Sequence, residues 1–381
     1  MRASLHIWIW SLSIFGIGNV AVADMAEEGL QMPTDGGFGG LFPVNPAFLR
    51  PKDMRFGALG LRSRRATTLD HTVEGGTKIA STVTNDFVGA GFGLDLGAGA
   101  GVAIEHVDQF RLVESLIDKR NVGKPIREVS KVQQTSVKLV VELTPELRAA
   151  IVMRLLQQQT LILGQPFLSP SQTTSYAPQM VGYGGGLSYS VADMGIGYAY
   201  YPPLHGKASV SGQEFIVSES GFIAVDAFAR SGAFTIGVLG KSWLVEIDDL
   251  AAGGTAADNK TRISYYGLDP DQYLIRTQLA MVGLDYALTK DLALRLGGGQ
   301  EQGRFDFRNL LVFDGVGVRQ RGPDKITTSR GRVALHGIFS QLEVDLGYGS
   351  FSRSYKFADN EGGGTYKTIG QEMAAVVVVR F

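Results

Sequence analysis

The chain has 381 residues, of which 50 are glycine, 13 are proline and none is cysteine, and its 36 Lys and Arg nearly balance its 37 Asp and Glu. Without cysteine, disulfide scaffolds, thiolate metal sites, cysteine nucleophiles and lipid attachment at an N-terminal cysteine are excluded. The balanced charge gives no support for a nucleic-acid partner, and glycine at nearly twice its usual frequency of about 7% permits a glycine-rich β protein.

The first 23 residues have the three parts of a cleaved secretory signal peptide. Arg2 supplies the positive charge, Ile7–Val20 form a short apolar stretch, and residues 21–23 (Ala-Val-Ala) offer a small-x-small cleavage site. An uncleaved anchor is the alternative, but serines interrupt the stretch, which is short for a span of ~20 residues. Because no later apolar run is long enough for a membrane helix, we expect an exported chain that is either a secreted globular protein or an outer-membrane β-barrel.

Residues 24–53 show no strand alternation and contain a glycine-rich apolar run at 36–43. A flexible backbone that carries Phe38, Leu41 and Phe42 could fold inside a barrel, where surrounding protein tolerates non-helical backbone. A disordered periplasmic tail is the alternative, but these side chains are unusually apolar for a solvated tail. We therefore predict a short N-terminal periplasmic plug, or hatch, over residues 24–53.

From residue 54 to residue 381, apolar residues recur with a period of two. In the last segment the odd positions from Ile369 to Phe381 are mostly apolar, whereas the even positions carry Glu372 and Arg380. The same alternation recurs at 137–143, 181–191, 196–200, 282–286, 292–297 and 342–348. Because the side chains of a barrel strand face lipid and lumen alternately, this pattern predicts an all-β fold, a transmembrane antiparallel β-barrel over residues 54–381.

The expected connections alternate between short and long. Tight turns are expected at Asp95–Ala98, Thr144–Glu146, Ala192–Met194, Arg230–Gly232, Leu288–Lys290 and around Gly337. Polar stretches lie between them at 69–82, 112–130, 157–178, 204–220, 246–272, 305–326 and 357–366. Short periplasmic turns and long extracellular loops are typical of outer-membrane barrels. The count is about 14 strands, with one strand from Met54 to Thr68, six hairpins and the terminal strand.

One segment has two interpretations. With the threonine at residue 144 as N-cap and the proline at residue 145 in the first helical position, a helix could start here and continue through residues 148–159. As a strand, the same segment places Ile151 toward lipid and Arg148 and Arg154 toward the lumen. We favour the strand, since a lone helix would break the even strand number that bacterial barrels require.

The predicted lumen carries as many acidic as basic side chains. The basic ones are Lys138, Arg148, Arg154, Arg295 and Arg380, and the acidic ones are Glu142, Asp285, Glu343, Asp345 and Glu372. An ion-selective porin is expected to show one sign in excess. The balance favours a self-paired network that braces the wall or anchors a plug.

The tripeptide Asn45-Pro46-Ala47, shortly before the first strand, resembles a motif in the hatch of FadL-like long-chain fatty-acid transporters. The order of plug and 14 strands is similar to that family, and Phe381 resembles the C-terminal assembly signal that barrel-assembly machinery recognises. The resemblance implies an outer-membrane channel for passive uptake of hydrophobic compounds, most of all long-chain fatty acids. Its implied partners are these lipophiles, outer-membrane lipid and lipopolysaccharide, and the assembly machinery.

The resemblance also implies a route, from an extracellular apolar groove into the barrel and out through a shift of the hatch or a lateral opening beside a kinked strand. The candidate substrate groove is an apolar run in the third long loop: Leu161, Ile162, Leu163, Phe167 and Leu168. A loop that packs on its own side chains is the alternative. The candidate strand kink is Gly97, Gly99 and Gly101, because glycine inside a strand marks bulges and bends. Tight packing against the plug is the alternative there.

Other kinds of site fit the sequence poorly. The glycine-rich runs at 89–93 and 97–101 lack the helix that must follow a dinucleotide-binding loop, and the histidines show no metal-protease spacing. The acidic residues at 246–258 could bind Ca²⁺, although a solvated loop explains them. Neither His106 nor His336 has an assignable serine partner, so we expect no enzyme activity, no metal and no cofactor. The rivals to uptake are a general porin and a non-transport barrel that acts as an adhesin or a secretion-machine scaffold.

Overall fold

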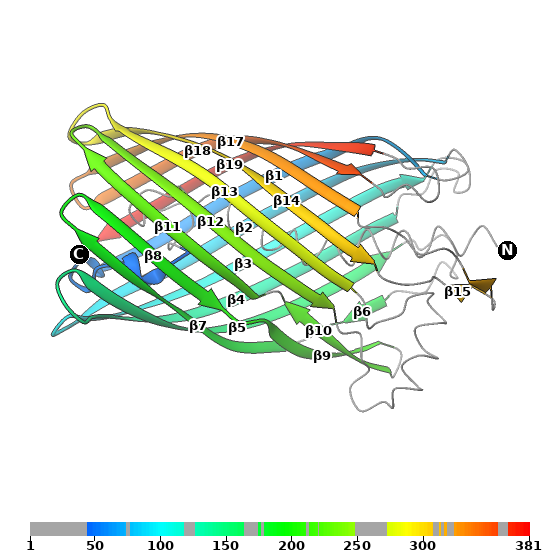
Figure 1. Cartoon of the computed structure of the whole chain (residues 1–381), viewed down its shortest axis with the longest axis horizontal. Coiled ribbons are helices and arrows are strands. Elements are labelled where there is room, and N and C mark those ends of the chain that lie inside the picture. Colours follow the sequence, from blue (N-terminus) through cyan, green and yellow to red (C-terminus); the bar gives the residue numbers. More distant parts are fainter. Residues whose placement is uncertain are drawn as a thin grey trace.

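The computed structural model describes residues 44–73, 77–117, 126–163, 174–176, 179–210, 213–219, 221–247, 273–307, 312–313, 316–317, 324–356 and 365–381. Within these ranges, fourteen strands form one closed antiparallel ring (Figure 1). A fifteenth, very short strand pairs with residues 160–162 of one of them. Strands that follow one another in the chain pair with each other, and the first strand pairs with the last. The prediction of an antiparallel barrel of about 14 strands is therefore confirmed.

The strands of the ring are β1 (Phe56–Val73), β2 (Thr77–Gly97), β3 (Ala100–Ile117), β4 (Ile126–Glu142), β5 (Leu147–Leu163), β7 (Gln179–Val191), β8 (Met194–Tyr201), β11 (Gly221–Ser231), β12 (Phe234–Ile247), β13 (Tyr273–Ala287), β14 (Leu292–Phe307), β17 (Asp324–Phe339), β18 (Leu342–Lys356) and β19 (Thr365–Arg380). The short pieces are β6 (Thr174–Tyr176), the pair β9 (Leu204–Val210) and β10 (Gln213–Glu219), and the pair β15 (Val312–Phe313) and β16 (Val316–Gly317). Two 3₁₀ turns, η1 (Pro46–Phe48) and η2 (Pro51–Asp53), precede β1. The described part of the chain has no helix that is both long and apolar enough to cross a membrane.

The outer and inner faces of the ring differ in polarity, because successive side chains of each strand point to opposite faces. On β5 the outward Ile151 is 62% exposed, whereas the inward Arg148 and Arg154 are 3% and 7% exposed. Outward aromatic residues lie near the strand ends, where Phe234 and Tyr286 stack with their ring centroids 4.8 Å apart. An apolar outer band with aromatic residues at its edge is the surface of a transmembrane barrel. The strand interpretation of residues 147–159 is confirmed.

The short turns gather at one end of the barrel, together with the C-terminus (Figure 1). We call this end the short-turn end; the sequence predicts that it faces the periplasm. Five of the six predicted turns lie within about two residues of the observed ones. The sixth is displaced, because Gly337 lies inside β17, paired with Leu292 and Val344, and the turn falls at Ser340–Gln341.

Several strands extend into stretches that their polarity marked as loops. Within the expected loop 69–82, β1 continues to Val73 and β2 begins at Thr77, and Thr68 still pairs with Ser81. The expected loop 204–220 contains the paired strands β9 and β10. Backbone pairing does not need apolar side chains once a strand has left the hydrocarbon layer. Polar residues therefore mark where the lipid-facing band ends, whereas the strand itself continues.

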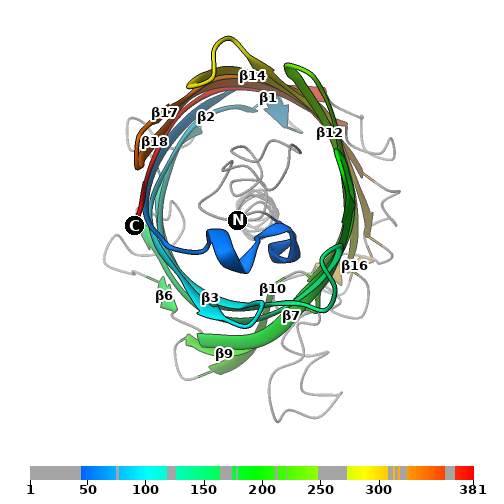
Figure 2. The ribbon, with the colours of Figure 1, turned by 90° about the vertical axis from the view of Figure 1, so that its left-hand side faces the viewer.

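Residues 44–53 run inside the ring at the short-turn end and lead into β1 in the wall (Figure 2). Ala47, Met54 and Phe56 form an apolar cluster with inward side chains of the wall, among them Val140 and Val376. This is the end of the predicted plug nearest to the barrel. The signal peptide at residues 1–23 and the plug residues Phe38, Leu41 and Phe42 lie outside the described residues.

Candidate functional site

The candidate site is the place where the segment Val44–Phe48 is fixed to the inner wall. Asn45 is completely buried and begins η1, where its Oδ1 accepts a hydrogen bond from the Ala47 N–H at 3.1 Å. Its Nδ2 donates to the Leu187 carbonyl of β7 at 2.9 Å. Pro46 follows as the first residue of the turn, where its missing N–H costs nothing. The amide of Asn45 thus shapes the turn and attaches it to the barrel.

Two glycines of the wall make room for this amide. Gly186 on β7 faces the Asn45 Oδ1, and Gly197 on β8 faces the Asn45 Nδ2, so that a side chain at either glycine would overlap the amide. Asp226 on β11 reaches the same point, with its Oδ1 2.6 Å from the position of a Cβ at Gly197. We call this recess the asparagine socket, formed by Gly186, Leu187, Gly197 and Asp226.

Three further hydrogen bonds hold the backbone beside Asn45. The Ala47 carbonyl accepts from Arg148 Nε at 3.0 Å and from the Ser188 hydroxyl at 2.6 Å. The Val44 carbonyl accepts from the Tyr201 hydroxyl at 3.2 Å. Buried carbonyls require such partners, so the wall of β5, β7 and β8 is chemically matched to residues 44–53, which we call the plug segment.

The candidate kink glycines lie at the end of β2 and just after it, where the pairing of β2 with β3 shifts in register between Asp95 and Gly97, and a kink that opens the wall stays a prediction. Gly97 ends β2 and Gly99 lies in the following turn, with φ of 77° and 74°, a conformation that glycine adopts without steric cost. Gly101 lies in β3, where a Cβ would approach Met54 Sδ to 2.6 Å, and β3 pairs with β4 without a break in register. Tight packing against the plug, the alternative interpretation, accounts for Gly101.

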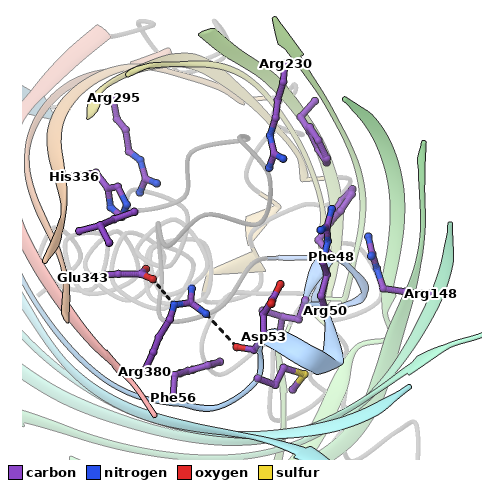
Figure 3. Close-up of a pocket in the computed structure, with 14 residues that line it drawn as sticks. Phe48, Arg50, Asp53, Phe56, Arg148, Arg230, Arg295, His336, Glu343 and Arg380 are labelled. Carbon is purple, nitrogen blue, oxygen red and sulfur yellow. Dashed lines mark hydrogen bonds and ion pairs between the residues drawn. The ribbon is translucent and has the colours of Figure 1, made fainter. Parts of the chain in front are cut away.

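A cavity of about 300 Å³ lies between the plug segment and the opposite wall, on β14, β17, β18 and β19 (Figure 3). Phe48 and Arg50 line its plug side, while Arg295, His336 and Glu343 line its wall side. Arg380 crosses between the two, because it pairs with Glu343 and also donates to the Asp53 carbonyl at 3.1 Å. The cavity is therefore polar, and one hydrogen bond links the last strand to residue 53, just before β1.

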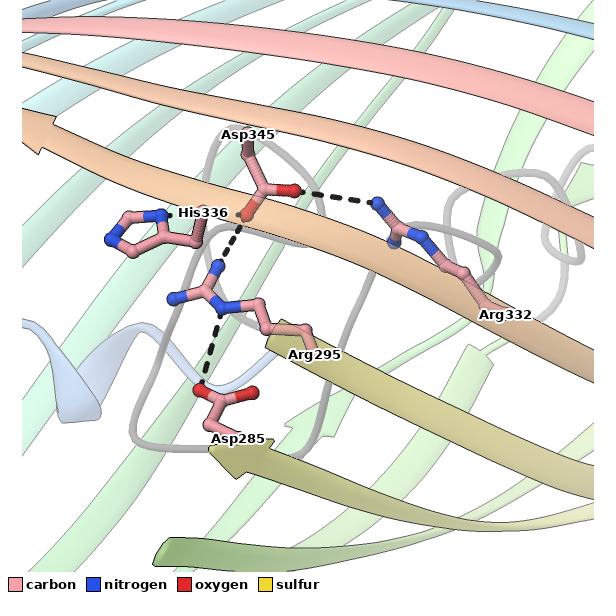
Figure 4. Close-up of polar contacts among 5 residues, drawn as sticks. All are labelled: Asp285, Arg295, Arg332, His336 and Asp345. Atoms are coloured by element: carbon pink, nitrogen blue, oxygen red, sulfur yellow. Dashed lines mark hydrogen bonds and ion pairs between the residues drawn. The ribbon is translucent and has the colours of Figure 1, made fainter. Parts of the chain in front are cut away.

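The predicted lumenal charges form a paired network on the wall (Figure 4). Arg295 pairs with Asp345, and its Nε lies 3.4 Å from Asp285 Oδ2. Arg332 and His336 approach the same Asp345 at 3.8 and 3.6 Å. The prediction of a self-paired network is confirmed for these carboxylates, and Arg148 supplies the plug anchor that the prediction also allowed.

The sequence interpretation missed several residues of the site. Ser188, Tyr201, Asp226 and the two socket glycines are all on inward positions of their strands, so their face could be read from the alternation. Their role could not, because contact with Asn45 depends on where the plug segment crosses the wall. The same holds for the inward Glu105, which pairs with the predicted Lys138 at 2.7 Å.

The candidate groove is only partly described. The residues at 161–163 are the last of β5, paired with 127–129 of β4, and are strand where a loop was expected. Phe167 and Leu168 lie outside the described residues. The groove therefore stays a prediction.

At the other end of the barrel, the side chain of Phe381 is exposed, its ring centroid lies 5.8 Å from that of Phe92, and its N–H donates to the Arg55 carbonyl. Its role as an assembly signal stays a prediction as well.

These features define a transmembrane β-barrel with a plug segment bound inside its short-turn end. No protein-family model matches the chain, and no curated protein is similar to it. Solved structures do share the fold, which is that of FadL-like channels. A TodX monoaromatic hydrocarbon channel deltaS2 mutant has a TM-score of 0.59 at 12% identity, over 88% of this chain and 93% of the other. The Pseudomonas putida toluene transporter TodX has a TM-score of 0.54 at 13% sequence identity, over 89% of this chain and 93% of the other. A Pseudomonas aeruginosa FadL homologue has a TM-score of 0.52 at 12% sequence identity, over 93% of this chain and 98% of the other.

Proposed function

We propose that the chain is an outer-membrane channel for the passive uptake of hydrophobic compounds, with long-chain fatty acids as the expected substrate. The observation that carries this proposal is a lipid-facing barrel whose lumen holds a segment anchored through the buried Asn45. A general porin is expected to keep an open aqueous channel. Barrels of the same fold named as toluene, monoaromatic hydrocarbon and FadL-homologous channels support a hydrophobic substrate.

The proposed route begins at the candidate groove on the extracellular loops and passes through the lumen to the plug. Transfer between apolar sites spares each chain carbon exposure to water, at about 0.8 kcal/mol per CH₂. At the plug, the cavity of about 300 Å³ beside Phe48 and Arg50 is the space that a shift of the segment would widen. A plug that moves while its anchor at Asn45 is released or strained would open this path.

Uptake of a radiolabelled long-chain fatty acid and of labelled toluene tests the proposal in cells that lack their own transporter. We expect protein-dependent uptake of at least one, altered by Asn45→Ala and unchanged by Gly57→Ala, a position with open space around the added methyl. Stable ion conductance of the purified barrel in planar bilayers, with no lipophile uptake, would instead indicate a porin. Normal folding with neither activity would indicate an adhesin or a scaffold.

A further inference from the structure

Farther from the short-turn end than the plug, the lumen carries a group of arginines that neither the plug anchor nor the network of Figure 4 includes. The arginine cluster consists of Arg62 and Arg64 on β1, Arg330 on β17 and Arg353 on β18. The other three guanidinium groups lie within electrostatic range of Arg64. Two glutamates accompany them, since Glu372 is the register partner of Arg64 and Glu301 accepts from Arg330 at 2.6 Å. Among the described residues, the four arginines thus lie beside two glutamates.

Several buried polar atoms of this cluster lack a hydrogen-bond partner among the described residues. They are Arg64 Nε, Arg330 Nε and Nη1, and both side-chain polar atoms of Asn85. Asn85 is only 1% exposed and is the register partner of Arg64 on β2. Because buried polar groups in native proteins almost always have partners, an amide and two guanidinium groups left in this state indicate an occupant.

The cluster is shaped for carboxylates. The Arg64 guanidinium lies over the Phe351 ring with its carbon 3.9 Å from the ring centroid. A guanidinium stacked on a ring keeps its N–H groups directed along its own plane, where a carboxylate oxygen can accept two of them. Guanidinium N–H groups form their strongest hydrogen bonds with anionic acceptors, which favours an anionic occupant over a neutral one.

The chain itself supplies such an occupant. Residues 24–43 contain Asp24, Glu27, Glu28 and Asp35 and no lysine or arginine. This segment ends where Val44 is bound inside the lumen through its carbonyl. Asp35 precedes Val44 by nine residues, which span up to about 30 Å when extended. Arg64 lies eight residues along β1 from Phe56, about 26 Å at the rise of a strand. Since Phe56 and Ala47 belong to the same apolar cluster, Asp35 can extend about as far along the barrel as the arginine cluster, and Asp24, Glu27 and Glu28, which precede it, can extend farther.

We propose that the acidic segment 24–43 docks on the arginine cluster. The plug is then held on two sides, by ion pairs to β1, β17 and β18 and by the asparagine socket of β7, β8 and β11. A tethered carboxylate has a high effective concentration, so it occupies the cluster in preference to a free anion or a substrate carboxylate. This contact does not depend on what the barrel transports.

The natural chain has no cysteine, so one introduced thiol reports on the segment alone. Thr34→Cys is placed beside Asp35, and its rate of reaction with a bulky maleimide is measured on the purified, folded full-length protein. We expect slow reaction, and at least tenfold faster reaction when Arg64→Glu and Arg330→Glu are added. Arg65→Glu, the adjacent outward position, is the matched control and should leave the rate unchanged. Retention of the heat-modifiable folded form on gels shows that each variant still forms the barrel.

Charge exchange makes the test specific. Adding Glu28→Arg and Asp35→Arg to the Arg64→Glu, Arg330→Glu variant should restore slow reaction. The proposal is overturned if the thiol reacts equally fast before and after the arginine reversals, or if the exchange restores nothing. A second variant, Ala374→Cys, places a thiol beside Arg62. The proposal is also overturned if the Thr34→Cys thiol reacts fast in every background while added laurate protects the Ala374→Cys thiol. That result would assign the cluster to a free carboxylate.

Discussion

Asn45 combines three demands in one side chain: it begins a turn, it is wholly buried and it reaches a carbonyl of the wall. An alanine satisfies none of the hydrogen bonds, and an aspartate cannot donate to the Leu187 carbonyl. The glycines opposite are constrained in turn, because the amide occupies the space of their missing side chains. The position of the plug is therefore set jointly by residues that are far apart in the sequence.

Gly197→Ala should loosen the plug. The added methyl overlaps the Asn45 amide, so the bond to Leu187 is lost and a buried polar group is left unpaired, at about 1–3 kcal/mol. We expect the backbone amides of Ala47 and Phe48 to exchange with deuterium faster, by roughly 30-fold for a loss of about 2 kcal/mol. Gly57→Ala is the matched control. Equal exchange in both variants would mean that the socket does not hold the plug.

Asp345→Asn should lower the stability of the barrel. Asp345 is buried and pairs with Arg295 and Arg332, so the substitution removes a carboxylate that faces two buried guanidinium groups. Removing one partner of a buried pair costs about 3–5 kcal/mol. The urea midpoint of the folded protein in detergent measures the loss. Asp291→Asn, which removes an exposed contact to Lys290 in a turn, should change the midpoint little. A normal midpoint for Asp345→Asn would show that the network adds no stability.

Which residues face the lumen could be predicted from the sequence, since parity along a strand decides it. Arg148, Arg154 and Asp345 were assigned in this way and are buried. Their partners could not be predicted, because Asp285 meets Arg295 only through the register of β13 with β14. The place of Gly97 at the end of β2 and of Gly99 in the next turn could not be predicted either, as glycine in a turn and glycine in a bent strand give the same local pattern.

At the scale of elements, β5 is the instructive strand. Its leucine- and glutamine-rich sequence, preceded by Thr144 and Pro145, has local features of a helix start. The structure instead forms a strand, because pairing with β4 and β7 satisfies its backbone and alternation places Arg148 and Arg154 in the lumen. A helix of the same residues would present arginines to lipid on part of its surface. Tertiary context overrides local propensity here.

Ile151→Lys tests this assignment from the lipid side. The side chain is 62% exposed on the outer face, and a lysine on the lipid face costs about 2–4 kcal/mol near the bilayer midplane. We expect a lower guanidinium midpoint for the protein folded in vesicles. Glu146→Lys, five residues earlier in the exposed turn, is the control and should change the free energy of unfolding by less than about 0.5 kcal/mol. No loss for Ile151→Lys would contradict contact of this face with lipid.

At the scale of the whole molecule, the alternation, the even strand number and the short-turn pattern were sufficient to predict the barrel, because a closed ring repeats one simple rule in every strand. The ends of the strands were predicted less well. β1 continues to Val73, and β9 and β10 pair within an expected loop. Side-chain polarity reports where lipid ends, and the strands continue past that point.

The contact of Phe381 should matter for assembly more than other exposed aromatic rings do. Its ring stacks on Phe92, and its N–H bonds the Arg55 carbonyl across the junction of β19 with β1. We expect deletion of Phe381 to reduce the heat-modifiable folded fraction in the outer membrane several-fold. Phe339→Ala removes a comparably exposed ring at the same end and is the control. An equal folded fraction for the deletion and for Phe339→Ala would mean that Phe381 has no special role in assembly.

The junction of β1 and β19 also fixes an order in time. It joins residues from the two extremes of the barrel, and the bond from Arg380 to the Asp53 carbonyl links positions 327 residues apart. Contacts of such long sequence separation form slowly, since most of the chain must be arranged before they are gained. The ring therefore cannot close until its last strand has arrived. We expect the residues before β1 to lie on the inner side by then, so that they are enclosed as the barrel forms and do not have to enter a finished ring.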